Sequence, residues 1–167
     1  IITTTVTIIV PPPTIENFLS GLYTEGQTNP NFAISVGKSP ASSGVAKAFS
    51  SISTDKYVNS YGVGSDALID SGANYVVTGL GLTTANDGES MDPTSFTLYG
   101  SNTPFVITKW INVSDTLGGG SNFASGGLPG QTLIASGLLN PPLQRYTAYP
   151  NIAISNNSTS YRYYRIV

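Results

Sequence analysis

The chain of 167 residues contains no cysteine and no histidine. The first absence excludes disulfide bonds and thiolate sites. The two absences together exclude Ser-His-Asp and Cys-His nucleophilic catalysis, and also nearly all zinc, iron and copper sites, which depend on imidazole or thiolate ligands. Carboxylate chemistry, or a hard cation held by oxygen ligands, is what remains, so we expect a non-catalytic protein without a cofactor other than structural calcium.

Charge is also scarce. Charged residues make up 10% of the chain and the formal net charge is −2, whereas a globular domain usually has about 25% charged residues. The seven Lys and Arg residues form no basic stripe, so no nucleic-acid partner is expected. No apolar run approaches the roughly 18 residues of a membrane-spanning helix, so no membrane span is expected either.

With so few charges, the polar surface must come from Ser, Thr, Asn and Gly, which favours strands and turns over amphipathic helices. Short β-prone segments alternate with Gly, Pro, Asn and Ser clusters, and this spacing predicts an all-β, antiparallel, jelly-roll-like β-sandwich over residues 32–167. A Gly/Ser-rich stretch over residues 115–130 is expected to be a long loop. The predicted strands are 32–36, 46–49, 57–59, 67–70, 75–84, 95–99, 107–113, 132–136, 151–155 and 160–167.

Two of these strands show the strand period of two clearly. In the strand from residue 95, Phe96 and Leu98 alternate with polar neighbours and are expected to point into the core. In the last strand, Tyr161 and Tyr163 are expected to share one face, which indicates one buried face and one solvated face.

Four segments carry a resemblance to a known family. They are residues 76–87 (VVTGLGLTTAND), 94–102 (TSFTLYGSN), 132–145 (TLIASG followed by PPLQR) and 160–167 (SYRYYRIV). Together they resemble the discoidin-like, or galactose-binding-domain-like, β-sandwich family found in exported bacterial and phage surface proteins. The resemblance implies a sandwich fold, a non-catalytic role and an extracellular, virion or cell-surface location.

Three acidic residues crowd one predicted loop: Asp87, Glu89 and Asp92. Oxygen ligands that alternate along a turn suit Ca²⁺, which takes six to eight oxygens, so these residues are candidate ligands of a structural calcium ion. The alternative is that Asp87 and Asp92 cap turns through their own backbone, as Asx residues often do.

Several aromatic residues fall in or beside predicted loops, where their rings can stack on sugars. These candidate glycan contacts are Tyr57, Tyr61, Trp110 and Tyr146, with Tyr149 beside them. The alternative is that they fill the core and rim of the sandwich, as aromatic residues at strand ends commonly do.

The first ten residues form the strongest strand pattern in the chain, because Ile2, Val6, Ile8 and Val10 share one face. Residues 1–13 are therefore interpreted as an extension strand followed by a stiff Pro11–Pro13 spacer of about 9 Å. Residues 14–31 are interpreted as a linker with a short helix near its start. The strand either pairs with a sheet edge of a neighbouring subunit or folds back onto its own domain.

These observations favour a non-catalytic structural protein of an exterior assembly. A virion decoration or cement protein, a tail-fibre component and a subunit of a cell-surface filament all fit this description. Its partners would be neighbouring copies of the same or a related protein, joined through the N-terminal strand. The alternative is a carbohydrate-binding or adhesive module, for which the partner is a glycan.

Overall fold

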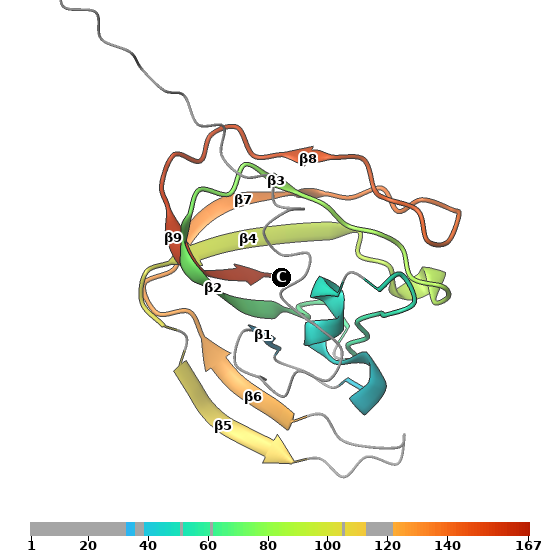
Figure 1. The fold of residues 1–167 in the computed structure, drawn as a ribbon, viewed down its shortest axis with the longest axis horizontal. Helices are drawn as coiled ribbons and strands as arrows, with labels where there is room; N and C mark the ends of the chain where they lie inside the picture. The colour runs from blue at the N-terminus through green and yellow to red at the C-terminus, as the bar shows by residue number, and fades with distance from the viewer. Residues whose placement is uncertain (1–32, 36–38, 51, 61, 105, 113–121) are drawn as a thin grey trace, which may run out of the picture.

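The computed structural model describes residues 33–35, 39–50, 52–60, 62–104, 106–112 and 122–167. Over these residues the chain is an all-β protein, as predicted, and its longest helix has five residues. The main sheet is antiparallel and has five strands in the order β1-β2-β9-β4-β7 (Figure 1). These strands are β1 (Ala33–Ile34), β2 (Ala67–Tyr75), β4 (Ser95–Ser101), β7 (Thr132–Leu138) and β9 (Tyr161–Ile166).

The strand that comes last in the sequence, β9, is the central strand of this sheet. Leu68 of β2 lies opposite Arg165 on one side, and Leu98 of β4 lies opposite Ile166 on the other. Thr97 and Val167 exchange two backbone hydrogen bonds of 2.8 and 2.9 Å, which continue the pairing to residue 167. The strands predicted over 95–99 and 160–167 are therefore confirmed, and they are neighbours.

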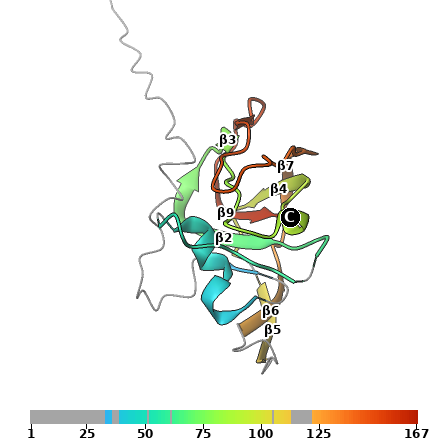
Figure 2. The same ribbon diagram turned by 90° about the vertical axis from the view of Figure 1, so that its right-hand side faces the viewer.

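A second layer covers one face of the sheet, which gives a sandwich-like arrangement (Figure 2). It consists of β3 (Gly79–Leu80) paired with β8 (Ile152–Ala153), and of two 3₁₀ helices, η1 (Ala41–Ser43) and η2 (Val45–Phe49). The hydrophobic core lies between the layers, and Phe96 and Leu98 are buried in it as the alternation predicts. Its other members are Ala33, Val45, Phe49, Ala67, Ile69, Val77, Ile154 and Tyr164.

The strand predicted over 75–84 is wrong for most of its length, since Tyr75 ends β2, only Gly79–Leu80 forms a strand, and Thr83 makes an isolated bridge. Two further predicted strands are wrong altogether. Residues 46–49 belong to the 3₁₀ helix η2, and the residues at its two ends, Val45 and Phe49, are buried. Residues 57–59 form no strand. The Gly/Ser-rich stretch is also not a loop throughout, since Asn122–Gly127 forms β6 and pairs with β5 (Val106–Asn112) in a separate two-stranded sheet. The small residues of β6 concealed it, because they show no apolar alternation.

The expected pairing of Tyr161 with Tyr163 on one face is also wrong. Tyr164 belongs to the core, and Tyr161 packs against it with the two rings at 87° and their centroids 6.3 Å apart. Tyr163 is buried outside that cluster, with the Arg162 guanidinium carbon 5.3 Å from its ring centroid. The pairing of β2 with β9 is irregular at this point, because Asp70 lies opposite Tyr163 and Tyr75 lies opposite Tyr161, so the regular ladder ends before Tyr161.

The N-terminal predictions, namely the extension strand over residues 1–13 and the linker over 14–31, lie outside the described residues. In the part of the chain that is described, no helix is long and apolar enough to cross a membrane.

Candidate functional site

Two loops lie side by side at one end of the sandwich and form what we call the loop platform, residues 82–93 and 139–150. The first loop leads from β3 into β4 and contains the 3₁₀ helix η3 (Glu89–Met91). The second leads from β7 into β8. Backbone hydrogen bonds join them, from Thr84 N–H to the Thr147 carbonyl at 3.0 Å and from Tyr149 N–H to the Leu82 carbonyl at 2.9 Å. The platform is therefore an ordered continuation of the β3–β8 pairing.

Arg145 is the main link between the two loops. Its guanidinium donates two hydrogen bonds to the Asp92 carboxylate, at 2.6 and 3.0 Å. It also donates to the backbone carbonyls of Ala85 at 2.9 Å and Asp87 at 3.1 Å. The hydrogen bond with Asp92 raises the pKa of Arg145. A bidentate contact with a carboxylate is the strong form of this interaction, so one side chain fixes the loop that precedes β4 against the loop that follows β7.

Thr84 makes a second link from inside the platform, where it is buried. Its hydroxyl donates to the Gln144 carbonyl at 3.0 Å and accepts from the Thr147 N–H at 2.9 Å. These bonds satisfy backbone groups on both sides of Arg145, which holds the turn around residues 144–147 in one conformation.

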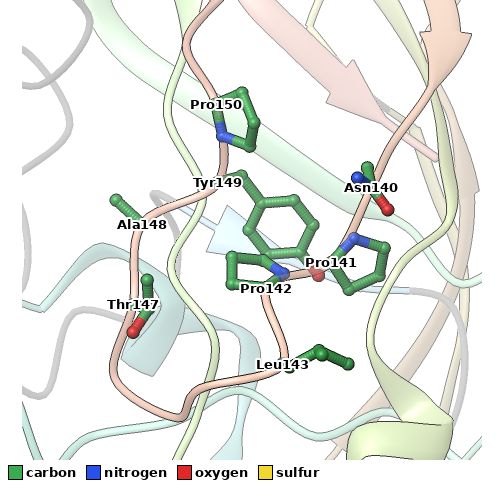
Figure 3. Close-up of a pocket in the computed structure, with 8 residues that line it drawn as sticks. All are labelled: Asn140, Pro141, Pro142, Leu143, Thr147, Ala148, Tyr149 and Pro150. Carbon is green, nitrogen blue, oxygen red and sulfur yellow. The ribbon is translucent and has the colours of Figure 1, made fainter.

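An open pocket of about 660 Å³ lies in the second loop (Figure 3). The Tyr149 ring is at the centre of the lining, and Tyr149 is buried and donates a hydrogen bond to the Pro93 carbonyl at 3.3 Å. Burial raises the pKa of Tyr149 to about 12. The rest of the lining is uncharged and rich in proline: Asn140, Pro141, Pro142, Leu143, Thr147, Ala148 and Pro150. The pocket therefore presents apolar rings and no acid or base.

The candidate calcium ligands are not gathered into one group. Asp87 pairs with Lys56, 2.7 Å away, and that hydrogen bond lowers the pKa of Asp87. Asp92 is taken up by Arg145, and Glu89 lies in η3. Among the residues that the structure describes, no three acidic side chains form a cluster suited to a metal ion. Calcium binding by these residues stays a prediction. Binding through Asp87 and Asp92 together would displace the side chains of Lys56 and Arg145 from them.

The candidate glycan contacts lie in different surroundings. Tyr57 packs against the core, and its hydroxyl donates to the Asp66 carbonyl at 2.9 Å. Tyr146 lies on the platform, is 55% exposed and has a left-handed φ of 54°. Trp110 lies on β5, opposite Ala124, and its side chain, like the whole of Tyr61, lies outside what the structure describes. Tyr146 belongs to the same loop as the pocket, directly before Thr147, but it is not one of the lining residues.

Sequence reasoning missed Arg145 as an organising residue. A signal was present, because Arg145 is the only Lys or Arg between Lys109 and Arg162. A lone cation in a long uncharged stretch suggests a specific partner, but the sequence alone does not say which acid.

A second region of interest is the outer strand β7. The sheet order places β7 at an edge, with β4 on one side and no strand of the described residues on the other. Leu133 and Leu138 are 58% and 90% exposed, and Ser136 is also exposed. The strand reads TLIASGL and contains neither charge nor proline. Most natural edge strands carry such residues as protection against pairing.

Neither the known family models nor the curated proteins with which the chain was compared match it.

Proposed function

We propose that this protein is a non-catalytic structural subunit of an exterior assembly, such as a virion decoration or tail-fibre component or a cell-surface filament. Copies would join through strand pairing that involves the N-terminal segment. The galactose-binding-domain-like resemblance is part of this proposal and gives it the exterior location.

The use of polar groups supports a structural role. Each Lys or Arg whose side chain the structure describes forms an ion pair with an aspartate, so none of them is held ready for a substrate. The pairs are Lys47–Asp55, Lys56–Asp87, Arg145–Asp92, Arg162–Asp70 and Arg165–Asp66. A catalytic site usually contains a titratable group whose environment prepares it for proton transfer, whereas these groups bind one another.

The exposed apolar surface of β7 carries the proposal. Isolated exposed leucines are common on soluble proteins. Here, however, Leu133 and Leu138 lie on one uncharged strand at the edge of a sheet. An exposed apolar edge of this kind favours pairing with another chain.

The test is the oligomeric state of the protein, measured by native mass spectrometry and light scattering with and without residues 1–13. We expect the intact chain to assemble and the truncated chain to remain a folded monomer with an unchanged strand signal in circular dichroism. An intact chain that stays monomeric at all accessible concentrations would rule the proposal out. Assembly of the truncated chain would rule out the N-terminal segment as the link.

The loop platform favours a second candidate function, that of a carbohydrate-binding or adhesive module. Tyr146 is exposed in the same loop as the proline-lined pocket, and aromatic and proline rings are flat apolar surfaces of the kind on which sugar rings stack. A glycan array tests this candidate, with Tyr146→Ser as the variant and Val63→Ser, an exposed apolar residue outside the platform, as the control. Binding that Tyr146→Ser abolishes and Val63→Ser retains would support it. An array without any bound glycan would count against it.

A further inference from the structure

We infer that the open edge of β7 is the acceptor for the strand Ile1–Val10 of a second copy of the chain. This inference rests on the proposed function, because it names the surface through which the copies would be joined. Three features carry it: the direction of the backbone groups of β7, the chemistry of its edge, and the composition of the donor segment.

The hydrogen bonds of β4 fix which groups of β7 are free to pair. Thr97 exchanges both of its backbone bonds with Val167 on the β9 side. Backbone groups of successive residues in a strand point to opposite sides, so those of Phe96 and Leu98 point toward β7. Their partners there are Gly137 and Ala135.

The backbone N–H and C=O groups of Ser136 and Leu138 therefore point away from β4, to the open side of the sheet. Leu139 agrees with this assignment, since its N–H donates to the Thr94 carbonyl at 2.8 Å. A shift in register between Leu98 and Tyr99 disrupts the ladder near Ile134. The regular part of the edge consequently runs from Ala135 to the end of β7.

The chemistry of this edge is suited to an uncharged β-strand. Ser136 and Leu138 are exposed, and no charged or proline residue interrupts the strand. The donor segment matches it, because residues 1–10 consist only of Ile, Val and Thr. These β-branched residues favour an extended backbone. Pro11–Pro13 then ends the pairing, since proline has no N–H to donate.

We assign the donor strand to a second copy. Each copy has one donor strand and one acceptor edge, so pairing between copies leaves further surfaces free for more copies to join. Contact between two different surfaces is heterologous, and it closes into a ring or continues as a filament. Either product is an assembly joined through the N-terminal segment, as the proposed function requires. A strand that folded back onto its own β7 would use up both surfaces and leave a monomer.

Disulfide cross-linking between separately prepared single-cysteine chains tests the contact directly, since the chain has no cysteine of its own. Side chains directly opposite in neighbouring strands are close enough for a disulfide. Thr4→Cys and Thr5→Cys sample both faces of the donor strand, and each is mixed with Ser136→Cys under oxidising conditions. Ser53→Cys, an exposed serine outside the sheet, is the matched control. We expect the yield of the mixed covalent dimer to be at least about tenfold higher with Ser136→Cys than with Ser53→Cys.

A second pair of variants tests the edge without cysteine. Leu138→Lys places a charge on the edge strand, whereas Leu143→Lys places it on the loop platform, and both leucines are at least 90% exposed. We expect Leu138→Lys to weaken self-association by at least about tenfold, while Leu143→Lys leaves it unchanged. Thermal midpoints equal to that of the parent show that both variants are folded.

The outcomes separate this inference from the proposed function. If the chain assembles and needs residues 1–13, but neither the cross-link nor the Leu138→Lys effect appears, then β7 is not the acceptor and the proposed function stands. A chain that carries both Thr4→Cys and Ser136→Cys tests for fold-back. A cross-link that forms within this chain, and never between the single-cysteine chains, would overturn the second-copy assignment. An intact chain that is always monomeric would overturn both.

Discussion

β4 and β7 are neighbours in the sheet and have seven residues each, yet they differ in how composition relates to burial. β4 reads SFTLYGS and buries Phe96, Leu98, Gly100 and Ser101. β7 reads TLIASGL, which contains three large aliphatic residues, and none of its residues is fully buried. The strand with more aliphatic residues is thus the more exposed one.

The difference shows that position in the sheet order, more than hydrophobicity, decides burial here. β4 has a paired strand on each side and the second layer across its inner face. β7 has one paired strand, so its outward leucines and outward backbone groups have no cover within the described residues. Apolar side chains that the fold leaves exposed on an edge are a reason to look for a partner.

The largest expected effect comes from the same substitution made in both strands. Leu98→Ala should lower the free energy of unfolding by about 2–5 kcal/mol, because Leu98 is 4% exposed and its removal leaves a cavity in the core. Leu138→Ala should change the stability of the monomer by no more than about 0.5 kcal/mol. Denaturant unfolding of the two variants measures both values. Equal losses would contradict the contrast between the strands.

A second comparison uses one glycine from each strand. A Cβ at Gly100 would meet the ring of Tyr161 and approach Ile134 Cδ1 to 2.9 Å, whereas one at Gly137 would meet only the Phe96 ring, at 3.1 Å. Gly100→Ala should therefore cost about 1–3 kcal/mol of stability through overpacking, and Gly137→Ala should cost less. Thermal unfolding ranks the two variants, and the reverse order would mean that the packing against β4 is looser than described.

Alkaline pH should lower the free energy of unfolding through two buried tyrosines, Tyr149 and Tyr164, neither of which lies in β7. Burial raises the pKa of both Tyr149 and Tyr164 to about 12 from an ordinary value of 10. The folded state thus holds these protons more tightly than the unfolded state, so the stabilisation is complete below pH 10 and is lost as the pH rises toward 12. Denaturant midpoints measured across this range should fall, and less steeply for Tyr149→Phe. A flat profile would contradict the assigned burial.

The smallest and most local effect should follow from loss of the Arg145–Asp92 ion pair, which lies at one end of the paired strands β4 and β7. Asp92 lies just before β4 and Arg145 lies beyond β7, so Arg145→Leu releases the loops at the Ser95–Leu138 end. Amide hydrogen exchange should quicken there and remain unchanged at the Gly100–Thr132 end. Lys56→Leu, which removes a pair with the exposed Asp87, is the control and should change neither end. Uniform acceleration along both strands would contradict a local role.

The sequence predicted much of the sheet and little of the platform, for different physical reasons. Phe96 and Leu98 follow a local period of two, so their strand and its buried face were predictable. Arg145 acts through Asp92, which is 53 residues away, and no local pattern encodes such a pair. β6 was missed because its pairing with β5, and not its own apolar pattern, defines it.

The central place of β9 sets an order on how the sheet can form. β2 and β4 share no direct pairing, and both pair with β9. Before residues 161–166 leave the ribosome, the main sheet can exist only as two unconnected halves, β1 with β2 and β4 with β7. The final strand completes the sheet by pairing with both β2 and β4, and its contacts span about 60 to 100 residues of chain. Folding of this sheet is therefore completed by its last strand, after synthesis of nearly the whole domain, and long sequence separations of this kind are typical of slowly folding proteins.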